Sequence, residues 1–115
     1  MHAASINPVD WKLGKQIPFL RLFKTVGIDV SGVVRQSASP LFVVGDAVFG
    51  SAEWGSLRYF AVARDHLLLS KPAQLSHAQA AALVMGFKTS FEALVERARV
   101  KAGERVGQTR CPCCM

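Results

Sequence analysis

Along this chain of 115 residues the spacing of the apolar residues changes once, from a pattern typical of strands to one typical of helices, and this change limits the folds that the chain can adopt. Up to about Pro72, apolar residues come in short β-branched runs separated by glycines, which is typical of strands and tight turns. From Ser76 to about Arg99 they recur at helical spacing. The sequence therefore predicts a mainly β domain of the α+β class, with helices at its C-terminal end.

The first part of the chain contains four candidate strands, at residues 28–34, 43–49, 57–63 and 66–69. In the first of these, Asp29 and Ser31 alternate with apolar residues, as expected of a half-buried strand. Residues 1–6 look like the end of a further strand. Several short strands joined by glycine-rich turns favour a barrel or a sandwich.

Two helices are expected in the second part. Ser76 and Gln79 form a capping box, and the residues that follow, 78–84, are almost wholly apolar. This helix is therefore expected to be buried on all sides, and Gly86 is expected to end or bend it. A second helix is predicted from about residue 87 to residue 99. Its apolar stripe consists of Phe87, Phe91, Leu94, Val95 and Ala98.

Composition argues against several classes of protein. No apolar run reaches the ~18–20 residues of a membrane span, so no membrane partner is expected. The three cysteines all lie within residues 111–114, where they cannot staple a fold, and we interpret them as an accidental tail. The net charge is +6, but the basic residues are scattered without a nucleic-acid-binding motif, so no nucleic acid is expected. A cytoplasmic location is the default, with mitochondrial import as the alternative.

Four motifs follow one another in a characteristic order. They are residues 7–11 (Asn-Pro-Val-Asp-Trp), residues 27–34 (Gly-Ile-Asp-Val-Ser-Gly-Val-Val), residues 44–50 (Val-Gly-Asp-Ala-Val-Phe-Gly) and residues 78–83 with Gly86. Together they resemble the catalytic domain of the medium-chain dehydrogenases/reductases. The resemblance is greatest to the zinc-independent quinone oxidoreductase branch with its related enoyl reductases, and it covers about residues 3–106.

The resemblance implies both a fold and a reaction. The family's catalytic domain is GroES-like (alcohol dehydrogenase-like N-terminal), a partly open β-barrel with appended helices. In the family, a hydride passes from NADPH to a quinone carbonyl or to the β-carbon of an activated alkene such as an enal. The substrate lies between this domain and a Rossmann domain.

The sequence departs from the family at both ends. Residues 1–106 are expected to form the GroES-like domain without its first strands, so the barrel would be incomplete. Residues 107–115 read as a tail foreign to the family, because no Rossmann strand or glycine-rich turn follows Val106. The chain is then expected to be the substrate-side half of an oxidoreductase, not competent alone and without tight NADPH binding. The alternative is a non-catalytic module that binds a full-length relative or another protein, as a homo- or hetero-oligomer.

Asn7 is the candidate catalytic residue. In the zinc alcohol dehydrogenases of the family a metal-binding Cys stands at this position, and a His stands at the position of Ile28, so no catalytic zinc is expected. In the zinc-free branch the matching Asn lies near the nicotinamide and the substrate oxygen. Asn7 is therefore predicted to donate a hydrogen bond to a carbonyl as it gains negative charge. The alternative is that Asn7 caps the Asn-Pro turn by bonding local backbone.

Four more residues complete the candidate site. Asp10 and Trp11 are candidates for substrate binding, with the alternatives that Asp10 holds neighbouring backbone and Trp11 anchors packing. Lys12 is a candidate for a cofactor phosphate, or else a solvated side chain. Thr89, expected near the start of the second helix, is a candidate contact to the nicotinamide ribose, or else an ordinary first-turn residue.

Overall fold

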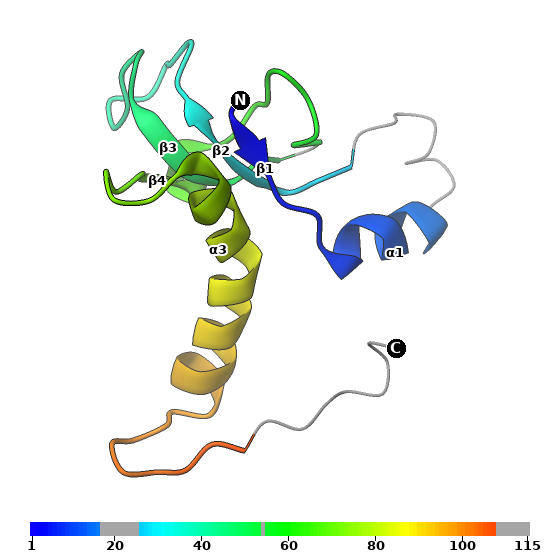
Figure 1. Ribbon diagram of the computed structural model, residues 1–115, viewed down its shortest axis with the longest axis vertical. Coiled ribbons are helices and arrows are strands. Elements are labelled where there is room, and N and C mark those ends of the chain that lie inside the picture. The colour runs from blue at the N-terminus through cyan, green and yellow to red at the C-terminus, as the bar shows by residue number, and fades with distance from the viewer. Residues whose placement is uncertain (17–25, 54, 108–115) are drawn as a thin grey trace.

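The structure is a computed structural model that describes residues 1–16, 26–53 and 55–107. Figure 1 shows a small sheet from which one long helix extends. The strands are β1 (Ala3–Ala4), β2 (Asp29–Val33), β3 (Ala47–Ser51) and β4 (Leu68–Ser70). The helical elements are α1 (Pro8–Gln16), the 3-10 turn η1 (Asp65–Leu67), α3 (His77–Phe91) and the π-helical turn η2 (Glu92–Arg97).

The four strands form one antiparallel sheet in the order β1-β2-β3-β4. Ser31 of β2 lies opposite Phe49 of β3, so these side chains share one face of the sheet with Asp29, two residues before Ser31. The other face carries Val30 and Val48, which are both buried. A four-stranded sheet followed by a C-terminal helix confirms the predicted order of strands first and helix last, while closure into a partly open barrel stays a prediction.

The predicted strand at residues 57–63 is wrong. Residues 57–60 form bends, and Tyr59 and Phe60 are 88% and 71% exposed instead of facing opposite sides of a sheet. The backbone N–H groups of Ser56 and Leu57 bond the carbonyl oxygens of Gly27 and Val26. The segment therefore closes a loop at the base of β2 and does not extend the sheet.

The capping box at the start of α3 is confirmed. Ser76 Oγ accepts from the Gln79 backbone N–H at 3.2 Å, and Gln79 Oε1 accepts from the Ser76 backbone N–H at 2.9 Å. The helix then continues through Gly86 and joins η2, so the predicted separate helix from residue 87 is wrong. A glycine inside a helix costs only about 1 kcal/mol, so it does not by itself end one.

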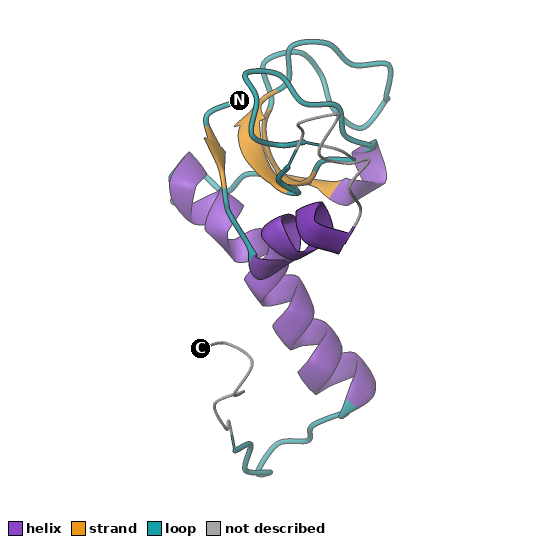
Figure 2. Cartoon of the chain, turned by 90° about the vertical axis from the view of Figure 1, so that its right-hand side faces the viewer, coloured by secondary structure: helices purple, strands orange, loops and turns teal. Residues whose placement is uncertain are grey.

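The expectation that the first helix is buried on all sides is also wrong. Only Ala80 and Ala81 of α3 are buried, and every residue from 86 to 107 is exposed. A five-residue strand covers about 17 Å, whereas the fifteen residues of α3 span about 22 Å. The sheet is therefore too short to cover the whole helix, and Figure 2 shows its second half extending away from the strands. Within the described ranges, no helix is long and apolar enough to cross a membrane.

Candidate functional site

The segment between β1 and α1 places Asn7 against the carboxylate of Asp29. Because β1 pairs with β2, the residues that follow β1 run beside the start of β2. Asn7 Nδ2 donates to Asp29 Oδ2 at 2.8 Å and to Ser5 Oγ at 3.1 Å. Ser5 Oγ in turn donates to Asp29 Oδ2 at 2.6 Å. The three side chains therefore form one closed hydrogen-bonded group.

Asp29 is fully buried at the point where three elements meet. Its Oδ2 also accepts from the backbone N–H of Met85 in α3, at 3.3 Å. Its Oδ1 is buried and has no hydrogen-bond partner within the part of the chain that the structure describes. Sequence reasoning placed Asp29 on the polar face of a half-buried strand, but α3 covers that face. A charged residue in a β-branched run was the signal that was missed, because a buried carboxylate needs partners.

The amide nitrogen of Asn7 is used within the protein. Its acceptors are the side chains of Ser5 and Asp29 and not the local backbone of the Asn-Pro turn, which was the alternative weighed for this residue. The predicted donation to a substrate carbonyl would compete with these hydrogen bonds. The catalytic role of Asn7 stays a prediction.

Asp10, in the first turn of α1, contacts the backbone of Asn7. It is buried, its Oδ2 accepts from the Asn7 backbone N–H at 2.7 Å, and its own N–H donates to the Asn7 carbonyl at 3.0 Å. This is the geometry of the backbone-holding alternative. A substrate contact by Asp10 stays a prediction.

Trp11 and Lys12 present side chains on the exposed side of α1. Trp11 is 52% exposed, and Lys12 Nζ lies 5.7 Å from the centre of its ring, within the range of a cation–π interaction. Both residues follow Asn7 by one turn of helix, so the structure brings the first four candidate residues to one segment. Their contacts to substrate and cofactor stay predictions.

Thr89 lies apart from this segment. It is exposed, it sits inside α3 and not at a helix start, and its carbonyl accepts from the Glu92 N–H. Thr89 therefore does not lie at a helix start, where free backbone N–H groups could bind a cofactor. A cofactor contact by the Thr89 hydroxyl stays a prediction without that support.

His77, the first residue of α3, joins the helix to β2. Its Nδ1 lies 2.8 Å from Ser31 Oγ, and its ring stacks on His2 with the ring centres 4.5 Å apart. The single hydrogen of Ser31 Oγ goes to the Val48 carbonyl, so this hydroxyl is left to accept from His77 Nδ1–H. Burial lowers the pKa of His77 below its ordinary value of 6.5, and the nearby His2, Lys71 and Met1 ammonium charges lower that pKa further.

We expect this lowered pKa to make the fold less stable in weak acid. As the pH falls through about 6.5, the unfolded chain takes up a proton at position 77 before the folded chain does, so the free energy of unfolding falls. The His77→Gln substitution should remove this part of the pH dependence in urea unfolding curves. At pH values above the ordinary pKa of His the difference between the two proteins should be constant. Parallel curves through the whole acid range would contradict the assignment.

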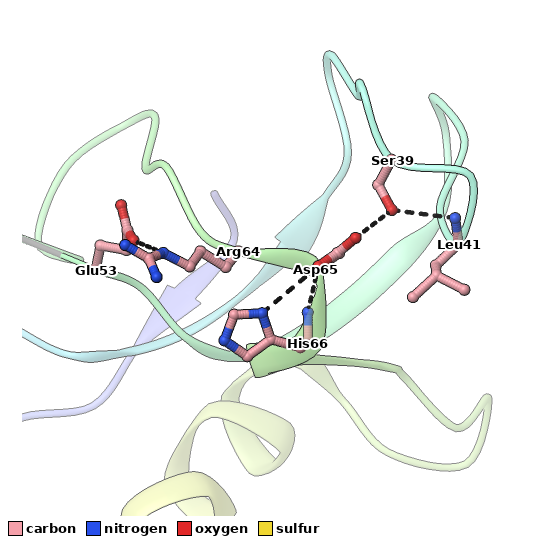
Figure 3. Close-up of polar contacts among 6 residues, drawn as sticks. All are labelled: Ser39, Leu41, Glu53, Arg64, Asp65 and His66. Carbon is pink, nitrogen blue, oxygen red and sulfur yellow. Dashed lines mark hydrogen bonds and ion pairs between the residues drawn. The ribbon is translucent and has the colours of Figure 1, made fainter.

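A second polar cluster, shown in Figure 3, holds the turn η1. Asp65 Oδ2 accepts from Ser39 Oγ at 2.7 Å, and this bond, followed by that from the His66 backbone N–H, holds the pKa of Asp65 below its ordinary value. Arg64 forms an ion pair with Glu53 beside it. The Ser39–Asp65 bond joins the segment before β3 to the segment after it, and the Arg64–Glu53 pair lies within the later segment. These contacts account for the cluster without a ligand.

An apolar groove of about 550 Å³ runs between the β3–β4 edge and α3. Leu83 and Phe87 wall it from the helix, and Phe49 and Leu69 wall it from the sheet. Its charged lining residues are Lys88, Glu92 and Glu96. Of the apolar stripe predicted for the second helix, Phe87 and Phe91 line the groove, and the whole stripe is exposed.

The structure groups no three His, Cys, Asp or Glu side chains as a metal site would need, within residues 1–16, 26–53 and 55–107. The cysteines at positions 111–114 and most of the predicted tail lie outside these ranges.

Comparison with known proteins shows what the chain is similar to. No protein-family profile matches it. It is 39% identical over 117 residues to the chloroplastic quinone-oxidoreductase homolog of Spinacia oleracea, covering 91% of this chain and 36% of that protein. It is 36% identical over 118 residues to the 2-methylene-furan-3-one reductase of Solanum lycopersicum, covering 90% of this chain and 30% of that protein. The chain therefore spans about a third of the length of the curated relatives it matches.

A solved structure gives the same result for the fold. The crystal structure of an alcohol dehydrogenase superfamily protein from Novosphingobium aromaticivorans aligns with a TM-score of 0.68 and 31% identity, covering 90% of this chain and 34% of that one. Together with the sequence relatives, this match confirms the resemblance predicted from the four motifs.

Proposed function

We propose that this chain, a relative of the quinone oxidoreductases in the medium-chain dehydrogenase/reductase superfamily, is the substrate-side part of an oxidoreductase that reduces quinones or activated alkenes. The reaction would be hydride transfer to a quinone carbonyl or to the β-carbon of an enal. Zinc would take no part in it. The activity belongs to the chain together with a cofactor-binding part, and we expect the 115 residues alone to be inactive.

One observation carries the proposal. Asn7, the residue that the resemblance marks as catalytic, is held by Ser5 and by a buried carboxylate at the junction of β1, β2 and α3. A reacting group that must be placed within a few tenths of an ångström needs this kind of support from neighbouring side chains. An asparagine that served only to cap a turn would not need a fully buried aspartate.

NADPH is the hydride donor that the resemblance implies, and the described residues do not by themselves fit it. Lys12 offers an exposed cation for a phosphate, but Thr89 lies on a separate element and inside a helix. No glycine-rich phosphate-binding turn between a strand and a helix occurs in the described ranges. We therefore assign no step of the reaction to cofactor contacts within these residues.

The test is to join this chain to the part of the Spinacia oleracea relative that follows the matched region. The fused protein should oxidise NADPH when p-benzoquinone or crotonaldehyde is present, measured by the loss of nicotinamide absorbance. Asn7→Ala should lower kcat/KM by about tenfold, because the loss of one hydrogen bond to a bound group costs about this much.

The matched control is Gln74→Ala, which removes an exposed amide from the turn before α3 and should leave kcat/KM unchanged. A fused protein that is folded and binds NADPH, yet oxidises it with neither acceptor, would contradict the proposal.

The alternative function is a non-catalytic module that binds a full-length relative. The exposed groove beside α3 favours it, since apolar patches of this kind are common at protein interfaces. Size-exclusion chromatography of this chain with the Spinacia oleracea relative separates the two functions. Co-elution, combined with an inactive fused protein, would favour the module.

A further inference from the structure

We infer that Asp29 is a positioning residue that orients the Asn7 side-chain amide. The amide nitrogen of Asn7 faces β2, and the amide oxygen of Asn7 is left to bind a ligand. The inference deepens the proposed function and rests on it for the presence of a ligand. Asn7 would then act as a hydrogen-bond acceptor, and the ligand group at this point would be an N–H or O–H donor. This differs from the donor role expected from the resemblance.

The first step is that the hydrogen-bonding partner of the Asn7 amide is the Asp29 carboxylate. An ionised carboxylate accepts hydrogen bonds and donates none, so it can face only the nitrogen end of an asparagine amide. Asp29 Oδ2 lies 2.8 Å from Asn7 Nδ2, at the distance of a charge-assisted hydrogen bond. The opposite orientation would set the Asn7 oxygen against the carboxylate oxygen.

The second step is that Ser5 removes the remaining freedom of the amide. Its hydroxyl donates its only hydrogen to Asp29, so towards Asn7 it presents an acceptor oxygen, 3.1 Å from Nδ2. Two acceptors therefore lie at the nitrogen end of the amide, and turning the amide over would set Oδ1 against both of them. Because the amide is planar, holding its nitrogen end in this way directs Oδ1 to the opposite side, and no described residue donates to Oδ1.

The third step is that Asp29 is itself held in place. It is fully buried, and the backbone N–H of Met85 reaches the same oxygen from α3. The carboxylate therefore cannot follow Asn7 if the amide turns. The orientation of Asn7 is set by the sheet and the helix together.

The test uses the side-chain amide of Asn7 as its own reporter. Asn7 is the only asparagine of the chain, so ¹⁵N-asparagine labelling gives a single pair of side-chain NH₂ signals in an NMR spectrum. In the parent chain the two protons should be shifted and should exchange slowly with water. In Asp29→Ala the proton that faced the carboxylate should lose its shift and exchange about tenfold faster or more, as the loss of a charge-assisted hydrogen bond requires.

Ser5→Ala keeps the test decisive if Asp29→Ala does not fold. This variant leaves Asp29 in place but removes one of the two acceptors at Asn7 Nδ2, so it should also shift the Asn7 signals. Asp46→Ala is the matched control, because Asp46 also accepts a backbone N–H, from Val43, but in a distant turn, and the Asn7 signals should not move.

Two results would overturn the inference. One is a parent chain in which both Asn7 protons are unshifted and exchange as fast as in an unfolded peptide. The other is a folded variant, at position 5 or 29, with both signals unchanged. Neither readout involves hydride transfer, so a failure of the proposed function and a failure of this inference are distinguishable.

Discussion

Replacing Asp29 by alanine is expected to lower the free energy of unfolding by about 3–5 kcal/mol, as breaking a buried charged hydrogen-bond network does. The substitution leaves the Ser5 hydroxyl, the Asn7 amide and the Met85 N–H without their common acceptor. It also opens a cavity in the contact between β2 and α3. Urea unfolding followed by far-ultraviolet circular dichroism measures the loss.

Asp46→Ala serves as the control for this prediction. The Asp46 carboxylate accepts the Val43 backbone N–H at 2.8 Å, but it is only half-buried and this bond holds a single turn. Its removal should cost about 1 kcal/mol, the usual value for a lost turn or cap hydrogen bond. Equal losses for the two variants would show that Asp29 is no more than a turn residue.

Gly50→Ala is expected to be the most damaging change of a glycine, with a loss of about 3 kcal/mol or more. Gly50 lies in β3 with φ of 153°, where residues with a side chain are strained. A methyl group there would fall far inside van der Waals contact with the carbonyl oxygen of Leu67. Because that oxygen belongs to the backbone before β4, the β3–β4 pairing would have to open. Thermal unfolding should show a large fall in Tm.

Gly45→Ala separates backbone strain from this steric clash. Gly45 has φ of 103°, but an added methyl group would meet no heavy atom within 4 Å. The expected loss is only about 1 kcal/mol, from the backbone conformation alone. If Gly45→Ala and Gly50→Ala lower Tm equally, the close approach of Leu67 does not determine the stability of β3.

Local patterns predicted those elements whose structure is decided locally. β2 and β3 follow from β-branched runs bounded by glycine, and the start of α3 follows from the Ser76–Gln79 capping box. The loop that includes Tyr59 could not be predicted in this way, because its backbone N–H groups donate to the carbonyl oxygens of Gly27 and Val26, about thirty residues earlier, and these bonds hold it away from the sheet.

The candidate site was predicted in part for the same reason. The Asn-Pro motif identified Asn7 and, through the first turn of α1, Asp10. Asp29 was missed because its burial depends on α3, and Met85 follows Asp29 by 56 residues in the chain. Thr89 was misplaced because the glycine at position 86 was expected to break a helix that in fact continues.

The attachment of α3 has a mechanical consequence. Hydrogen bonds of His77 and Met85 attach the helix to β2. Residues 86–97 are all exposed and make no hydrogen bond to the sheet. The last of these attachments along the helix is the bond from Met85 to the Asp29 carboxylate, so a change of helix angle there moves everything beyond it. At 1.5 Å per residue, Arg97 lies about 18 Å beyond Met85, so a tilt of roughly 10° at the sheet moves the tip by about 3 Å. A small change in the helix angle beside Asn7 would thus displace the far end of the helix by about the size of a side chain.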